Sequence, residues 1–243
     1  MEKEIEGIVL RQVPYKEKDK IVTIITREGL LSFNARGIAS LTSKNSSSCN
    51  LFSLSNFTLN EKGNYLSLKQ GKLIDSHYEL YESLESMSAI QLAFESLIRF
   101  MDENDTKIYD YVLSFFDNLK KGFDSMTLLV ILLAQLIKSS GYALEYSSCV
   151  ECGNKKNIVQ VNYRVGGFLC YECAKKYNEI HDDKDYLKSF RYVFMVSYDM
   201  MNHYELDRKV ASRLLKEFID FLNFNFDNKE IKAYEIYKNS IIM

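Results

Sequence analysis

The sequence contains none of the common catalytic signatures. It has no G-x-x-x-x-G-K-[ST] phosphate loop, no G-x-S-x-G nucleophile turn and no H-E-x-x-H zinc helix. Histidine is scarce, and an isolated histidine such as His181 or His203 usually lies on the surface or caps a helix. These absences argue against ATP use through a phosphate loop, serine-type acyl transfer and zinc proteolysis. We expect a protein that is not an enzyme.

Long apolar segments are also missing. The longest apolar stretch, Met126 to Ile137, has 12 residues, whereas a bilayer span needs about 20. The chain opens with Met-Glu-Lys-Glu-Ile-Glu instead of an apolar signal segment. We therefore expect a cytoplasmic protein without membrane contact, associated with the nucleoid if it binds DNA. In that reducing compartment, paired cysteines favour metal binding over disulfides.

The chain lacks the strong positive charge of a dedicated nucleic-acid binder, with a net charge of −2 and a pI of about 6.0. The charge is uneven, however. Residues 1–80 carry 11 Lys and Arg against nine Asp and Glu, and residues 149–176 carry five against two. Local basic patches can therefore still bind phosphates, whereas the remaining chain is acidic.

Proline is almost absent, since Pro14 is the only one. Short β-branched and alternating runs predict strands near residues 8–10, 21–26, 30–33, 52–59 and 66–74, with turns at 27–29 and 61–64. Five such strands suit a closed barrel of the OB type, and a five-stranded SH3-like barrel is the alternative. We predict an α+β protein whose residues 1–78 form this barrel. The serine-rich segment 37–50 is expected to be a flexible loop.

Residues 79–243 are predicted to form one α-helical domain. Apolar residues recur at three- and four-residue spacing in helices expected from about 76, and at 106–120, 125–139 and 206–222. Ser76 and Glu79 resemble a capping box for the first helix, which would leave His77 half exposed at its start. The stripe Leu206–Leu222 is flanked by cations that could hold an acidic tail, but a core helix is the favoured interpretation.

Four of the five cysteines form two tight pairs. Cys149 and Cys152 are followed, after 17 intervening residues, by Cys170 and Cys173, which is the spacing of a zinc knuckle. Each pair lets one tight turn direct two sulfurs at an ion, and two turns complete a tetrahedron of thiolates. Four thiolates leave no open position for water. We therefore predict one structural Zn²⁺ per chain, in a module at about 147–176 that is inserted in the helical domain.

Other roles for the cysteines fit the pattern less well. Zinc deaminases combine H-x-E with P-C-x-x-C; His77 and Glu79 supply an H-x-E, but no proline precedes either pair. A deaminase would also leave one pair unused, and unrelated or redox-active pairs would not require the repeated spacing. The fifth cysteine, Cys49, has no further ligand nearby, and we expect an idle thiol.

Basic and aromatic residues of the barrel segment are the candidate contacts for nucleic acid. The basic residues cluster around the first three expected strands, where a solvated surface is the alternative role. Aromatic side chains there can stack on bases, as in single-strand-binding barrels, although a place in the core is favoured for them. The candidate nucleic-acid-binding residues are Arg11, Lys18, Lys20, Arg27 and Arg36, with Lys16 nearby, and the aromatic candidates are Phe33, Phe52, Phe57 and Tyr65.

An ordered set of short segments resembles the RecO family of bacterial recombination mediators. The segments are residues 7–11 (Gly-Ile-Val-Leu-Arg), 14–22 (Pro-Tyr-Lys-Glu-Lys-Asp-Lys-Ile-Val), 26–30 (Thr-Arg-Glu-Gly-Leu), 35–37 (Ala-Arg-Gly), 73–76 (Leu-Ile-Asp-Ser), 141–142 (Gly-Tyr), the first cysteine pair and 166–167 (Gly-Gly). The resemblance spans nearly the whole chain and is strongest in residues 7–37 and 141–173. Each segment alone is modest, but the order is specific.

The resemblance implies an N-terminal OB-fold, a helical body and a zinc module. It implies binding of single- and double-stranded DNA, annealing of complementary strands and help in loading RecA on strands coated by the single-strand-binding protein. The implied partners are RecR, the acidic C-terminal tail of the single-strand-binding protein and, less directly, RecF and RecA. A non-catalytic interaction scaffold with weak DNA affinity is the alternative function.

That alternative arises because the sequence departs from the family after Arg36. Ile38, Ala39 and Ser40 follow where the family has further basic residues, and only Lys44 is nearby. Phosphate contacts dominate nucleic-acid affinity and its salt dependence, so each missing cation weakens binding.

We predict DNA affinity that is weaker than usual for the family and falls as salt rises. Replacing both cations in Lys20→Ala/Arg36→Ala should weaken it further, because each removes a phosphate contact. Titration of a labelled single-stranded oligonucleotide at several salt concentrations measures both effects. Affinity that ignores salt, or that survives the double substitution unchanged, contradicts the prediction.

Overall fold

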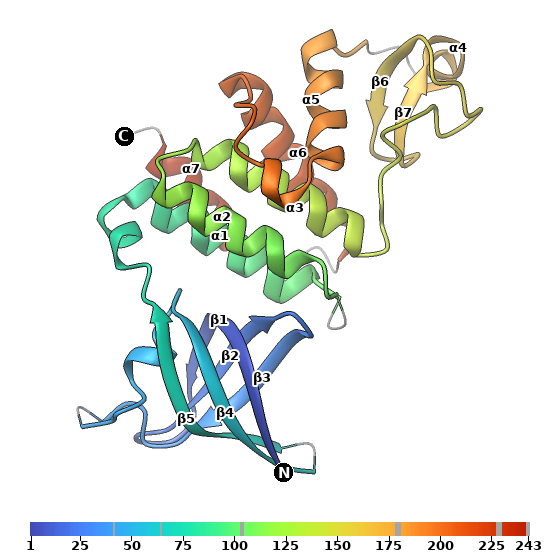
Figure 1. Ribbon diagram of the computed structural model, residues 1–243. Helices are drawn as coiled ribbons and strands as arrows, with labels where there is room; N and C mark the ends of the chain where they lie inside the picture. Colours follow the sequence, from blue (N-terminus) through green and yellow to red (C-terminus); the bar gives the residue numbers. More distant parts are fainter. Residues whose placement is uncertain (41, 64, 103–104, 178–180, 227–229, 242–243) are drawn as a thin grey trace. The chain divides into compact units, whose positions relative to one another are not determined.

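The computed structural model describes residues 1–40, 42–63, 65–102, 105–177, 181–226 and 230–241 (Figure 1). The chain folds as two units. The barrel unit contains Met1–Met87 and Asp102–Asp110, and the helical unit contains Ser88–Met101 and Tyr111–Met243. The domain boundary predicted between residues 78 and 79 stays a prediction. No helix among the described residues has the length and apolarity to cross a membrane.

The barrel unit is built from five strands in the predicted segments. They are β1 (Glu2–Pro14), β2 (Lys20–Thr26), β3 (Gly29–Ala35), β4 (Leu54–Lys62) and β5 (Tyr65–Asp75). Their order around the closed barrel is β1-β2-β3-β5-β4, with β1 antiparallel to both β2 and β4 and a parallel contact between β3 and β5. This Greek-key closure is that of an OB-fold. The OB prediction is confirmed, and the order separates the barrel from the SH3-like alternative.

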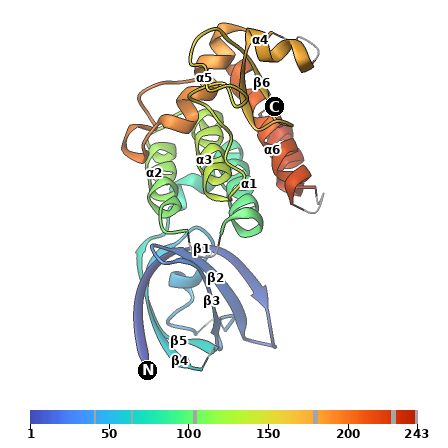
Figure 2. The ribbon, with the colours of Figure 1, turned by 90° about the vertical axis from the view of Figure 1, so that its right-hand side faces the viewer.

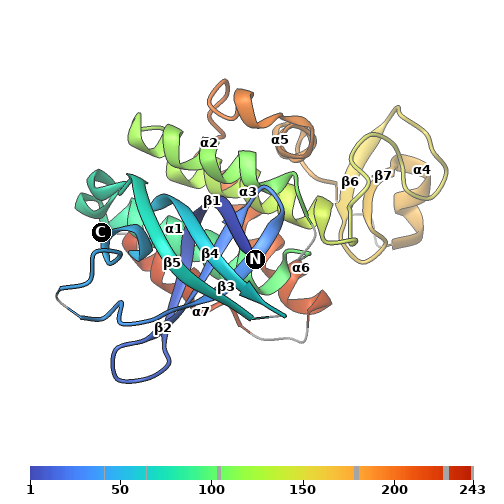
Figure 3. The same ribbon diagram turned by 60° about the horizontal axis from the view of Figure 1, so that its bottom comes forward.

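A bulge in β1 makes the closure possible. The register of β1 against β2 shifts between Val9 and Arg11, and such an extra residue bends a strand and increases its twist. The first part of β1 pairs with β4, from Glu2 with Asn60 to Ile8 with Leu54, whereas its later part pairs with β2. Figure 3 shows β4 and β5 side by side along the same barrel.

Aromatic and β-branched side chains fill the barrel. Val9, Val22 and Ile24 are fully buried, and the rings of Phe33 and Phe57 lie 5.1 Å apart between centroids. Phe52 is also buried, and its ring centre lies 4.9 Å from that of Tyr81. The favoured core role is thus confirmed for the three phenylalanines. Tyr65 is different, since 43% of its surface is exposed.

Part of the segment predicted to be a flexible loop packs into this core. Residues 47–49 form a 3₁₀ turn, η1 (Ser47–Cys49), in which Ser48 and Cys49 are completely buried. Ser48 donates to the carbonyl of Asn45, and Ser55 donates to the carbonyl of Ser48. Burial raises the pKa of the Cys49 thiol to about 11. The prediction of a flexible loop is wrong for this part because serine hydroxyls satisfy the backbone while Cys49 fills apolar space.

The helices of the helical unit pack around one apolar helix, α3 (Ser125–Ser139). Among the described residues, the long helices of the unit are α1 (Leu84–Phe100), α2 (Ile108–Lys120), α3, α5 (Lys184–Met195), α6 (Arg208–Asn225) and α7 (Lys232–Ser240). The first residues of α1 and α2 belong to the barrel unit. Asp124 caps α3 by accepting from the Thr127 amide, and residues 125–137 are all buried. α3 packs against α5 and α6 (Figure 2). The inward residues of α6 are Leu214, Leu215, Phe218 and Leu222, which confirms the core interpretation of that stripe.

The start of the first helix was predicted wrongly. His77 has a left-handed backbone conformation with φ of 49° and is 2% exposed, so it is neither helical nor half exposed. A 3₁₀ turn, η2 (Tyr78–Glu82), follows it. The helix begins at Leu84, where the Ser83 hydroxyl accepts from the Ser86 amide in the usual capping geometry. Ser76 and Glu79 matched a common capping pattern, but Ser83 is the serine that caps the helix.

We predict that Gly71→Ala destabilises the barrel unit. A methyl group at residue 71 would lie 2.0 Å from the Ser48 hydroxyl oxygen, and such overpacking costs about 1–3 kcal/mol. Chemical denaturation of the single variants and of Ser48→Gly/Gly71→Ala measures the coupling. The double variant should lose less stability than the sum of the two single losses. Strict additivity would show that the two residues do not collide.

Candidate metal centre and nucleic-acid interface

The four predicted metal ligands come together in one module. The module contains β6 (Ile158–Asn162), β7 (Gly167–Cys170) and α4 (Tyr171–Ala174). The sulfurs of Cys149, Cys152, Cys170 and Cys173 all lie within 4.8 Å of one another, and those of Cys152 and Cys170 are 3.7 Å apart. Sulfurs around a tetrahedral Zn²⁺ at about 2.3 Å lie about 3.8 Å apart. The donor set and its spacing therefore fit a metal ion.

The backbone of each turn supports these sulfurs. Gly153 has φ of 72° and donates to the carbonyl of Cys149, which closes the first knuckle. Gly166 and Gly167 have φ of 94° and 140°, so the predicted sharp return of the chain uses conformations that favour glycine. A methyl group on Gly167 would also meet the carbonyl oxygen of Glu145 at 2.2 Å. The backbone of Glu145 therefore lies directly against the start of β7, where it donates to the carbonyl of Gly166 and accepts from the amide of Phe168.

The thiols of the cluster have unequal proton affinities. Burial raises the pKa of Cys149, but amide donors from Cys170, Cys152 and Glu151 outweigh it and lower that pKa to about 6. Burial together with the neighbouring sulfurs raises the pKa of Cys173 to about 12. An electron-rich cluster of this kind is stabilised when a cation replaces its protons.

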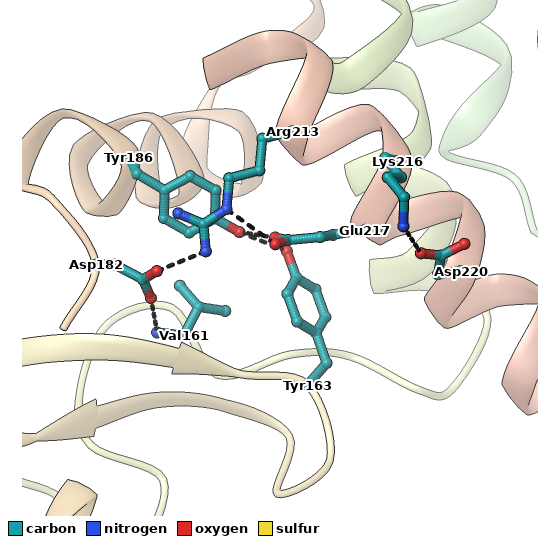
Figure 4. A network of polar contacts seen from close by, with 8 residues as sticks. All are labelled: Val161, Tyr163, Asp182, Tyr186, Arg213, Lys216, Glu217 and Asp220. Carbon is teal, nitrogen blue, oxygen red and sulfur yellow. Dashed lines mark hydrogen bonds and ion pairs between the residues drawn. The ribbon is translucent and has the colours of Figure 1, made fainter. Parts of the chain in front are cut away.

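A network of polar side chains joins the module to the helices (Figure 4). Arg213 of α6 donates to Asp182 at 2.6 Å and to Glu217 at 2.9 Å, and its guanidinium lies 3.7 Å from the ring centre of Tyr186. Asp182 also accepts from the Val161 amide of β6 at 2.7 Å. Tyr186 of α5 donates to Glu217 and lies 2.9 Å from the Tyr163 hydroxyl.

This network attaches the β6–β7 hairpin of the metal module to α5 and α6. Burial and the nearby Glu217 raise the pKa of Tyr186, so the phenol stays protonated as a donor. Arg213 loses hydration, but its bonds to Asp182 and Glu217 raise the pKa of its guanidinium. Spacing in the sequence gave no sign of these partners, because they come from three segments that are far apart.

On the barrel, the bulge in β1 places Arg11 on the outer face. Val9 and Val22 point into the core, and Arg11 lies directly opposite Thr23. Side chains alternate along a strand, and directly opposite residues share a face. Arg11 and Thr23 are therefore outward. Thr23 lies opposite Ser32 in β3, and their hydroxyl oxygens are 2.9 Å apart.

The outer row continues to an exposed aromatic ring. Asn34 of β3 donates through Nδ2 to the hydroxyl of Tyr65 at 2.6 Å. The Oδ1 atom of Asn34 is buried and has no hydrogen-bond partner among the described residues. We call Arg11, Thr23, Ser32, Asn34 and Tyr65 the polar row. It crosses the β2–β3 face, which OB-folds use for oligonucleotides.

The other predicted nucleic-acid contacts lie apart from the polar row. Lys18 and Arg36 are exposed in two loops that meet where the Ala39 amide donates to the carbonyl of Lys18. Lys20 shares the inward side of Val22 and donates to Gln12 at 2.7 Å. Arg27 lies at the other end of β2, paired with Asp110 at 2.6 Å and 5.1 Å from the ring centre of Tyr109. The five cations thus occupy four separate places: Arg11 in the polar row, Lys18 with Arg36 in the two loops, Lys20 on the inward side, and Arg27 beside Asp110.

Sequence reasoning missed Thr23, Ser32 and Asn34. Their type is common in strands, and only the register of β1, β2 and β3 shows that they share a face with Arg11. The two-residue period of a strand contained part of this signal, since Thr23 lies between Val22 and Ile24 and so points to the opposite side from them.

Comparison with known proteins adds the family context. Residues 1–77 match the family description "Recombination protein O N terminal", and residues 81–225 match "Recombination protein O C terminal". A "DNA repair protein RecO" of Bacillus pumilus is 30% identical over 174 residues, which are 70% of this chain and 68% of the relative. That of Listeria welshimeri is 26% identical and covers 87% of this chain and 84% of its own. That of Caldanaerobacter subterraneus is 24% identical, with 93% and 95% covered.

We predict that the cluster binds one Zn²⁺ per chain, and that Cys152→Ser abolishes stoichiometric binding. Cys152 is exposed, so serine replaces it with little effect on packing and removes one ligand. Metal content by elemental analysis and thiol protection measure the effect, and Cys49→Ser is the control because its buried sulfur lies in the barrel unit. Full metal content in Cys152→Ser would contradict a four-thiolate site.

Proposed function

Because the chain belongs to the RecO family of DNA repair proteins, we propose that it is a non-catalytic mediator that binds DNA and anneals complementary single strands. The observation that carries the proposal is the polar row on a barrel of OB topology. In the mechanism we propose, Arg11 and the hydroxyl groups of Thr23 and Ser32 hold phosphates and sugars. Tyr65 stacks against a base.

Annealing requires that most bases remain free to pair. The polar row offers one exposed aromatic ring, whereas Phe33, Phe52 and Phe57 are buried. A strand held by its phosphates and a single stacked base keeps its neighbouring bases open to a complementary strand. Asn34 donates from Nδ2 to the Tyr65 hydroxyl and so holds the exposed ring in position for stacking.

The metal in this proposal is Zn²⁺ with a structural role. Soft thiolate ligands select Zn²⁺ among common cellular cations, and four of them leave no position for substrate. When bound, Zn²⁺ cross-links the two knuckles. The Arg213 network then carries that rigidity to α5 and α6.

The proposed partners follow the family. We propose contact with single- and double-stranded DNA, RecR and the acidic C-terminal tail of the single-strand-binding protein, with RecF and RecA involved indirectly as RecA is loaded. We place this work in the cytoplasm, at the nucleoid. The alternative is an interaction scaffold with weak DNA affinity. Two observations favour this alternative. Arg27 is paired with Asp110. Ile38, which follows Arg36 where the family has further basic residues, is buried and offers no charge to a phosphate.

Annealing of two labelled complementary oligonucleotides tests the proposal. We expect the protein to accelerate annealing at low salt and less at moderate salt, with and without the single-strand-binding protein. Arg11→Ala/Tyr65→Ala should slow the accelerated rate about tenfold or more, since stacking on one base alone contributes about 1–3 kcal/mol. The matched control is Lys72→Ala/Tyr78→Ala, which removes an exposed cation and an exposed tyrosine of the same unit outside the polar row.

The outcomes separate the two functions. A loss confined to Arg11→Ala/Tyr65→Ala places annealing on the polar row. Equal loss in both double variants contradicts that placement. No acceleration by the metal-loaded wild type favours the scaffold.

A further inference from the structure

The outward face of α5 is a row of cations. Tyr186, Phe190 and Val193 point into the helical unit and are fully buried. On the other side, Lys184, Lys188 and Arg191 recur at four- and three-residue spacing, which places them along one face. At 1.5 Å per residue, the row is about 10 Å long. One strand of B-form DNA presents about three phosphates over that distance.

This row forms one wall of a groove with the metal module. α5 packs beside β6 (Figure 1), and the groove between them has a volume of about 490 Å³. Its lining includes Lys155 from the loop after the first knuckle, together with Lys184, Lys188 and Arg191, and it contains no carboxylate. Four cations therefore converge without an acidic residue among them.

Nearby carboxylates neutralise little of this charge. Glu151 and Glu172 of the module are paired with Lys176 and Lys175, at 3.2 and 2.8 Å. Asp185 approaches Lys188 at 3.7 Å, but both side chains are more than three-quarters exposed, and such pairs are weak in water. Arg191 is held in place by a bond from Nε to the carbonyl of Tyr146 and by the ring of Phe168, 5.2 Å away.

We propose that this groove, the α5 groove, binds a nucleic-acid backbone and is a second DNA contact besides the polar row. The proposal rests on the function proposed above, since it adds a site to the same DNA-binding activity. Lys155 and Lys184 have no ion-pair partner in the part of the chain that the structure describes, and both are exposed. They are free to exchange their counterions for phosphates. A protein with two backbone sites can hold two strands, which is what annealing requires.

An acidic amphipathic peptide fits the groove less well. Such peptides anchor an apolar side chain in a well-formed pocket. Here Phe168 is completely covered, Ile158 and Leu187 are half buried, and Met195 is the one strongly exposed apolar residue of the groove lining, at 63%. The cations form a line along a helix rather than a ring around an anchor pocket, and a line matches a backbone of regularly spaced charges.

The test compares lysine substitutions in the full, metal-loaded chain. The test variant is Lys155→Ala/Lys184→Ala/Lys188→Ala, and the control is Lys107→Ala/Lys121→Ala/Lys232→Ala, which removes the same charge from exposed lysines elsewhere. The probe is a fluorescein-labelled 40-nucleotide single strand, titrated at several NaCl concentrations. Each lost phosphate contact lowers the slope of log affinity against log salt by about 0.7. We expect the slope to fall by about two and affinity to fall about tenfold in the test variant only.

Each further outcome is decisive. If the test variant matches the control in slope and affinity, the α5 groove does not bind DNA and the inference is overturned. If Arg11→Ala/Tyr65→Ala still loses binding in that case, the proposed function stands without the second site. Wild type that binds no DNA overturns both proposals. An unchanged DNA slope combined with loss of binding to a labelled acidic peptide makes the groove a peptide site and also overturns the inference. If the triple variant fails to bind metal, Lys184→Ala/Lys188→Ala replaces it, because this double variant leaves the knuckle unchanged. Its salt slope should then fall by about two-thirds as much as expected for the triple variant.

Discussion

The Arg213 side chain holds together segments that lie far apart in the sequence, since its partner Asp182 precedes it by 31 residues. Its guanidinium bonds to Asp182 and Glu217 and stacks on Tyr186, while Asp182 reaches the backbone of β6. A small metal module has too little apolar surface to build an independent core. Its four sulfurs are one source of order, and the Arg213 network is the other. The surface of the module, including the α5 groove, depends on both.

Much of the fold could be predicted from the sequence because its signals are local. The β-branched run of β2 and the apolar stripes of α3 and α6 are periodic within single elements. The paired spacing of Cys149, Cys152, Cys170 and Cys173 also places the ligands without any knowledge of the fold. The failures came from competition between local and distant partners. Ser76 matched a capping pattern, yet Ser83 caps the helix; the segment around Cys49 is polar in composition, yet its thiol fills the barrel core.

The candidate nucleic-acid surface also combines features that local sequence predicts with features that depend on distant residues. Counting cations near the first three strands found Arg11, but it grouped this residue with Lys20 and Arg27, which the register and the Asp110 pair place elsewhere. Lys184, Lys188 and Arg191 could be recognised as one helix face from spacing alone, whereas Lys155 joins them only through the packing of β6 against α5. A surface made by two elements requires their arrangement, and pair contacts over such distances leave no periodic pattern.

The bulge between Val9 and Arg11 has a consequence for how this barrel can vary. Before the bulge, odd-numbered residues of β1 face the core, and after it even-numbered residues do. Because the side-chain period is two, the extra residue Leu10 is what shifts this parity, and deleting it would restore plain alternation with Arg11 still outward and Gln12 still inward. A single-codon deletion in a regular stretch of β1 would instead exchange inside and outside for the residues beyond it. The strand therefore tolerates loss of a residue at its bulge better than loss of a residue anywhere in its regular pairing.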